Sequence, residues 1–75
     1  MTIPSNDAEL LMNPREVGPG YAFALIMNRG DGSRMVQTEC TDEKRAKSYA
    51  RSARMKRRSP TLYRRGPDGW TEVKF

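Results

Sequence analysis

The chain has few residues that could support histidine, thiol or metal chemistry. Its 75 residues include no histidine and one cysteine, Cys40. A disulfide within one chain is therefore excluded, and a closed zinc site, which needs four Cys or His ligands, is nearly excluded. Catalysis that depends on histidine is excluded as well. We expect Cys40 to be a buried structural thiol and the protein to need no metal and no cofactor.

Long apolar segments and enzyme motifs are also missing. The longest apolar candidate, residues 21–27, has the length of a strand, whereas a bilayer span needs roughly 18 to 20 residues. The N-terminus lacks the basic and apolar regions of a secretory signal, so we expect a cytoplasmic protein without membrane contact. No phosphate-binding loop and no dinucleotide-binding fingerprint occurs. A fold of this size also lacks room for a water-excluding pocket, so we expect no enzyme.

The hydrophobic content is low, at 36%, and the length suffices for one small domain. A chain this short buries only about 60% of the surface that its unfolded form exposes, so its stability is marginal. A second copy or another partner that completes the core is therefore one option.

What the sequence has in excess is positive charge on its second half. The formal net charge is +5. Residues 1–40 hold three basic and five acidic side chains, whereas residues 41–75 hold eleven basic and four acidic ones. Such an asymmetry indicates a partner for the basic half.

Two regions of the chain differ in how densely proline and glycine interrupt them. Residues 1–20 contain three prolines and two glycines, which predicts an irregular N-terminal arm. One or two helical turns at residues 7–12, capped by Ser5 or Asn6, would fit within this arm. Residues 21–75 carry the regular patterns, so we expect the domain there.

The domain begins with a predicted hairpin. Residues 21–28 are apolar on both alternating faces, which is typical of a central strand that is covered on each side. Residues 29–33 have strong turn chemistry, and residues 34–40 alternate as a half-buried strand does. Two shorter strands are predicted at 61–65 and 70–75, on either side of a turn at 66–69.

A helix is predicted between the two strand pairs. Thr41 is its expected N-cap, two acidic residues follow, and the helix should end near Lys56, with Arg57 and Arg58 in its last turn. Ala46, Tyr49, Ala50 and Ala53 lie on one face, with Tyr49 as the one large anchor. The predicted core comprises Phe23, Leu25, Met27, Val36, Ala46, Tyr49, Ala50, Ala53, Leu62, Val73 and Phe75.

The element order is therefore ββαββ. It predicts an α+β fold in which a three- or four-stranded, mainly antiparallel sheet carries one basic helix on a face. The order of the strands stays open at this point.

The other side of the helix carries a ridge of cations. Its members are spaced three or four residues apart over about 20 Å, and they are Lys44, Lys47, Arg51, Arg54 and Arg58. Like charges at these spacings destabilise a helix by a few tenths of a kcal/mol per pair, so the ridge indicates a use. Lys56, Arg57, Arg64 and Arg65 add charge at or beyond its C-terminal end.

Such a patch suits the phosphates of a nucleic acid or an acidic protein surface. Ser48 and Ser52 are the only uncharged polar residues of the helix after Thr41, which favours recognition of the backbone over sequence readout. Tyr63 and Trp70 are candidate stacking residues, but the aromatic motif of RNA-recognition domains is absent, so packing explains them better.

Three hypotheses of function follow. The first is a basic module that docks on nucleic acid through phosphates. The second is an inhibitor or adaptor that uses the same ridge, or the sheet aromatics, against a host protein complex. The third is an assembly subunit that works as a homodimer.

The hairpin at 21–40, the helix at 41–58 and the strand pair at 61–75 together resemble small phage-encoded proteins that bind and inhibit host machinery. Anti-CRISPR proteins and inhibitors of host RNA polymerase are examples. The resemblance is one of size and element order, and it implies a host-takeover function in the host cytoplasm. Many such inhibitors are acidic mimics of DNA, whereas this chain is basic. An inhibitor of this kind would therefore touch the nucleic acid or an acidic patch of a nucleoprotein.

Overall fold

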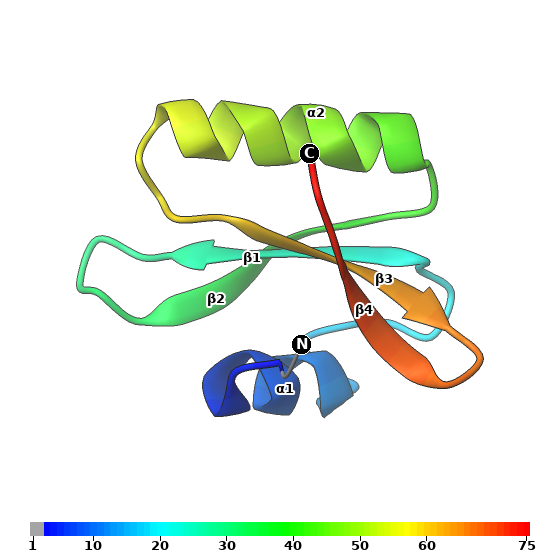
Figure 1. Cartoon of the computed structure of the whole chain (residues 1–75). Helices are drawn as coiled ribbons and strands as arrows, with labels where there is room; N and C mark the ends of the chain where they lie inside the picture. Colours follow the sequence, from blue (N-terminus) through cyan, green and yellow to red (C-terminus); the bar gives the residue numbers. More distant parts are fainter. Residues whose placement is uncertain (1–2) are drawn as a thin grey trace.

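The fold is a four-stranded antiparallel sheet between two helices (Figure 1). The computed structural model describes residues 3–75. In chain order the elements are α1 (Ser5–Met12), β1 (Phe23–Asn28), β2 (Arg34–Cys40), α2 (Glu43–Met55), β3 (Thr61–Gly66) and β4 (Gly69–Val73). The α+β class, the antiparallel sheet and the basic helix on one face are as predicted.

The strand order, which the sequence left open, is β2-β1-β3-β4. The strand with two apolar faces, β1, is central, and it pairs with β2 on one side and with β3 on the other. The β1–β2 ladder shifts register between Leu25 and Ile26, where β2 contributes one extra residue. The helix α2 then carries the chain from the edge strand β2 across β1 to β3 (Figure 1).

Each face of the sheet has its own core. On the α2 face, alternate residues of β1 pack against three alanines of the helix, all of them buried: Phe23, Leu25, Met27, Ala46, Ala50 and Ala53. On the α1 face, Leu11 and Val17 cover Ala24, Ile26 and Tyr63. The alanine stripe lets α2 lie close to the sheet, as its small side chains predict.

The N-terminal segment differs most from the prediction. The helical turns expected at residues 7–12 within the irregular arm are confirmed as an eight-residue helix, α1, which already begins at Ser5. Pro4, and not Ser5 or Asn6, stands at its N-cap. Proline suits the start of a helix because it has no N–H that would be left without a partner. Residues 1 and 2 of the predicted arm lie outside the described residues. Leu11 and Val17 are buried, so this segment completes the domain instead of trailing from it.

Four details of the core also differ. Tyr49, the expected anchor, is 43% exposed, because it lies at the edge of the alanine stripe and the helix is too close to the sheet to admit its ring. Val36 is half-buried and packs on the α1 face. Val73 and Phe75 are only partly buried beside the α2 core. Tyr63 and Ile26, which the predicted core omitted, are fully buried.

Candidate nucleic-acid interface

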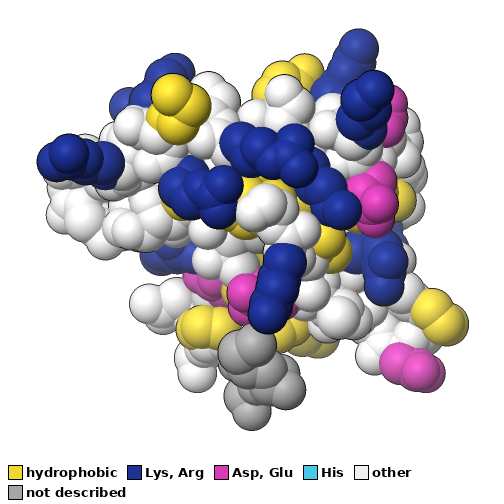
Figure 2. Space-filling view, turned by 45° about the horizontal axis from the view of Figure 1, so that its top comes forward, with side chains coloured by type: hydrophobic (Ala, Val, Ile, Leu, Met, Phe, Trp, Pro, Cys, Tyr) yellow, Lys and Arg dark blue, Asp and Glu magenta, His cyan; other side chains and the backbone are white. Residues whose placement is uncertain are grey.

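The cations of α2 point outward because the opposite side of the helix is fixed on the sheet. Asp42, and not the predicted Thr41, is the N-cap, and its side chain accepts a hydrogen bond from the Lys44 backbone N–H at 3.0 Å. Ala46 and Ala50 then face the sheet, which leaves Lys44 and Arg51 exposed. Figure 2 shows Lys and Arg side chains in a run across this face, with acidic side chains beside the run.

Five of the predicted site residues are exposed and make no ion pair or side-chain hydrogen bond within residues 3–75. They are Lys44, Arg51, Lys56, Arg57 and Arg58, which we call the basic face. Arg45, which the sequence analysis did not single out, is also exposed on α2. These charges have no internal function that the contacts show, so they are available to a ligand.

Lys47 and Arg64 are less free, because both lie near Glu43. The Lys47 ammonium is 3.7 Å from one Glu43 oxygen, and the Arg64 guanidinium is 4.0 Å from the other. Exposed pairs of this kind contribute little stability. They do place a negative charge at the N-terminal end of the ridge, so the ridge is less continuous than the spacing predicted.

Arg54 and Arg65 are held by the fold. Arg54 donates a 3.1 Å hydrogen bond to the main-chain oxygen of Phe75 and lies 4.9 Å from the centroid of its ring. Arg65 donates to the main-chain oxygens of Pro19 and Gly18 at 2.8 and 3.2 Å. These two side chains are therefore fixed in the fold and are not part of the basic face.

Neither aromatic candidate is a free stacking platform. Tyr63 is fully buried, so the prediction of it as a contact residue is wrong. Trp70 is half-buried, and the Arg65 guanidinium lies 4.6 Å from its ring centroid. Both residues pack in the fold, which is the alternative that the sequence analysis favoured.

The chain leaves α2 through a tight turn that groups three cations. The helix ends at Met55, so Arg57 and Arg58 lie beyond it and not in its last turn. Arg58 N–H donates to Ala53 and Arg57 N–H to Arg54, at 3.2 and 3.0 Å, which is the Schellman pattern. The left-handed position of that motif normally holds glycine, but here Arg57 occupies it, with φ of 57°.

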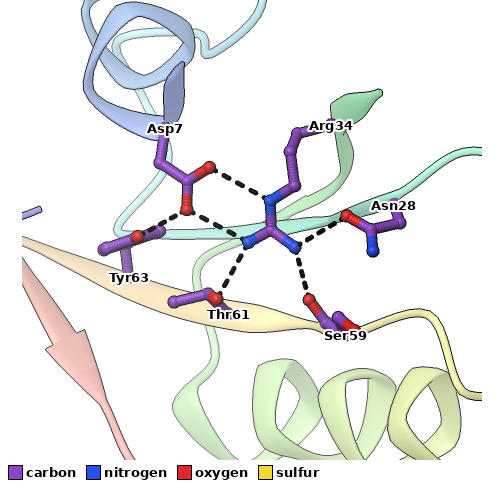
Figure 3. Close-up of polar contacts among 6 residues, drawn as sticks. All are labelled: Asp7, Asn28, Arg34, Ser59, Thr61 and Tyr63. Atoms are coloured by element: carbon purple, nitrogen blue, oxygen red, sulfur yellow. Dashed lines mark hydrogen bonds and ion pairs between the residues drawn. The ribbon is translucent and has the colours of Figure 1, made fainter. Parts of the chain in front are cut away.

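A hydrogen-bonded cluster around Arg34 contacts the loop that follows α2 (Figure 3). The Arg34 guanidinium donates two 3.1 Å hydrogen bonds to the Asp7 carboxylate and one of 2.9 Å to Thr61 Oγ1. Its remaining nitrogen donates to Asn28 Oδ1 at 3.2 Å and to the main-chain oxygen of Ser59. One side chain thus joins α1, β1, β2 and the loop before β3.

Tyr63 of β3 completes this cluster on the face of the sheet that α1 covers. Its hydroxyl donates a 2.6 Å hydrogen bond to Asp7, whose carboxylate is buried. Burial alone would raise the pKa of Asp7, but hydrogen bonds from Arg34 and Tyr63, with the Arg34 charge, lower it below its ordinary value. Burial and the bond to Asp7 raise the pKa of the Tyr63 hydroxyl well above its usual range. The cluster is therefore a fixed ion pair that holds α1 on the sheet.

Other chemistry is sparse in the part of the chain that the structure describes. Cys40 is buried, as expected, and its thiol lies 3.3 Å from the Asp42 carbonyl oxygen. Residues 3–75 contain no group of three or more His, Cys, Asp or Glu side chains placed to hold a metal ion. Neither α1 nor α2, the helices within these residues, is long and apolar enough to span a bilayer.

Comparison with protein-family models, with curated protein sequences and with solved structures finds no match to this chain.

Proposed function

We propose that this protein binds nucleic acid without catalysing a reaction, and that the basic face contacts the phosphates. The observation that carries the proposal is the set of five exposed cations that have no counter-charge within residues 3–75. Other arginines do have internal partners, because Arg34, Arg54 and Arg65 each donate hydrogen bonds to groups of the fold. Like charges at helical spacing lower the stability of α2, and these side chains make no internal contact that would offset this cost. A surface of this kind suits the binding of a polyanion.

The chemistry of α2 favours contact with the backbone of the nucleic acid over contact with base edges. Between the cations its outer side offers Ser48 and Ser52, and the helix has no Asn or Gln to pair with adenine. Phosphate contacts position a protein on nucleic acid but carry no sequence information directly. We therefore expect affinity that depends strongly on salt and little on sequence.

The test is a fluorescence-anisotropy titration of a generic DNA duplex and a single strand at several salt concentrations between about 50 and 200 mM. Each phosphate neutralised contributes a slope of about 0.9 in log K against log salt on duplex DNA. The double variant Lys44→Ala/Arg51→Ala should lower that slope by roughly two and weaken binding to all sequences alike. Circular dichroism checks that α2 still forms.

A matched control carries the same change of net charge on the opposite side of the sheet. Arg15 follows α1 and is exposed, so Arg15→Glu removes as much positive charge without touching the basic face. Its slope should stay near that of the unaltered protein. If both variants lose affinity equally, only net charge matters and the proposal fails.

Contact with an acidic protein surface, as in an inhibitor of the phage-encoded kind, is the competing hypothesis for the same side chains. It predicts no binding to either nucleic acid at the lower salt concentration. It also predicts a complex with a protein partner that survives moderate salt.

A further inference from the structure

A hollow at the C-terminal end of α2 gathers cations from two separate loops. Its volume is about 230 Å³, and its lining comprises Asn28, Arg29, Gly30, Lys56, Arg57 and Arg58. The first three belong to the end of β1 and the turn before β2, and the last three to the chain leaving α2. Both loops lie at the same end of the molecule (Figure 1). We propose that this hollow binds the terminal phosphate of a nucleic-acid strand, an inference that rests on the proposed function.

Hydrogen bonds hold in place the two loops that form the hollow. Asn28 N–H donates a 2.8 Å hydrogen bond to the Arg58 carbonyl oxygen, which ties the hairpin to the loop. Arg34 donates to Asn28 Oδ1 and to the Ser59 oxygen from behind (Figure 3). Because Asn28 Oδ1 accepts from Arg34, its amide nitrogen remains as a donor without a partner among the described residues.

The backbone of this loop is strained in a way that capping alone does not explain. Arg57 and Ser59 both have positive φ, 57° and 47°, where side chains are disfavoured by about 1 to 2 kcal/mol. A cation near a helix C-terminus does complement the helix dipole. A glycine at position 57 would close the helix with less strain, however, and Arg29 lies on a different element, where it caps no helix. The two arginines are better explained by a shared ligand.

The charge of the hollow fits a phosphate monoester better than an internal phosphodiester. Four cationic residues line one small volume, and no acidic residue lines it. The acidic residue of this turn, Asp31, accepts hydrogen bonds from the Ser33 hydroxyl and N–H at 2.7 and 3.0 Å. A monoester carries about −1.5 to −2 charges and three strong acceptor oxygens, whereas a phosphodiester within a strand carries one charge.

An adjoining hollow provides space for the nucleoside that bears this phosphate. Its volume is about 340 Å³, and it shares Lys56 and Arg58 with the basic hollow. Its other lining residues carry no charge, and they are Met27, Gln37, Ser52 and Ala53. A strand that follows the basic face along α2 would thus end here, with its last phosphate in the basic hollow.

The experiment compares one labelled single strand with three kinds of end: 5′-phosphate, 3′-phosphate, or hydroxyls only. We expect one phosphorylated form to bind about tenfold more tightly than the hydroxyl form, the effect of one additional charge-assisted hydrogen bond. Equal affinity of all three forms would overturn the inference but leave the proposed function intact. Failure of every form to bind at low salt would overturn both.

Two variants locate the effect. Arg29→Ala should abolish most of the preference for the phosphorylated end while binding of the hydroxyl form changes little, because Arg29 is not part of the basic face. Arg57→Gly should also abolish most of the preference, and it should weaken binding of all three forms because Arg57 belongs to the basic face. Arg57→Gly should also raise the melting temperature, because it removes the strained side chain, so a loss of preference cannot be ascribed to unfolding. Arg15→Ala is the matched control and should keep the full preference. A preference that survives both variants would place the phosphate elsewhere.

Discussion

At the scale of single residues, the ion pair of Arg34 with Asp7 decides whether the N-terminal segment belongs to the fold. The two residues are 27 positions apart, and neither lies in a motif, so no periodicity could have paired them. Tyr63 joins them from a strand still further along the chain. The signal available in the sequence was the position of Asp7 four residues from both Ile3 and Leu11, which places it on the apolar side of a helix.

Removing the Asp7 charge should destabilise the whole domain. Asp7→Asn leaves the Arg34 guanidinium largely buried without a counter-charge, so we expect the free energy of unfolding to fall by about 2 kcal/mol. Urea unfolding followed by the fluorescence of Trp70, the single tryptophan, measures it. Asp31→Asn is the control, since that side chain is exposed and should change stability by at most about 0.5 kcal/mol. Equal small effects would show that the ion pair contributes nothing.

The same residue predicts a pH dependence. The folded-state pKa of Asp7 lies below its unfolded value of about 3.9, so its contribution to stability is complete above that pH. The contribution is lost as the pH falls through the folded-state pKa. The stability difference between the protein and Asp7→Asn should therefore be constant near pH 7 and shrink below about pH 4. A difference that stays constant down to pH 2 contradicts a depressed pKa.

At the scale of elements, α2 shows both the power and the limit of periodicity. Its alanine stripe and its outward cations follow from the spacing of residues along a helix, whereas its two ends differ from the prediction by a residue or two. Tyr49 was misplaced because an angular position at the edge of a stripe does not tell how closely the helix approaches its sheet. The engagement of Arg54 with Phe75 was also hidden, since it depends on where the chain returns after β4.

The close approach of α2 gives an element-scale prediction. Ala50 is fully buried against the sheet, so Ala50→Leu should overpack this interface and lower stability by about 1 to 3 kcal/mol. Ser48→Leu introduces the same side chain on the exposed side of the helix and should change stability by no more than about 0.5 kcal/mol. Thermal or urea unfolding of both variants makes the comparison. If Ala50→Leu is as stable as Ser48→Leu, α2 packs more loosely than described.

At the scale of the whole molecule, the sequence predicted the domain but not its second layer. The strand with two apolar faces required a cover on each side, yet only the helix at 41–58 was assigned to a face, and the helical turns at 7–12 were left in an irregular arm. The other cover, α1, is short and follows a proline, and its packing depends on Asp7, Leu11 and Val17 together. Of the predicted interface, the exposure of Lys44 and Arg51 follows from helical spacing. The grouping of Arg29 with Lys56, Arg57 and Arg58 depends on the strand order, which one sequence does not reveal.

The basic face and the structural ion pair lie on different parts of the molecule. The basic face lies on α2 and on the loop that follows it, while Asp7 and Arg34 join α1 to the opposite side of the sheet. Removing a cation of the basic face should therefore weaken binding without lowering stability, whereas a variant of Asp7 or Arg34 should lower stability without weakening binding by the folded protein.

The most direct measurement is the set of amide chemical-shift changes of the labelled protein during titration with a short DNA duplex at low salt. The proposed function predicts that the largest changes fall on residues 44–58, that those of α1 stay small, and that all of them reverse when salt is raised. Changes centred on α1 or on β4 would contradict the proposal, and so would the absence of any change at low salt.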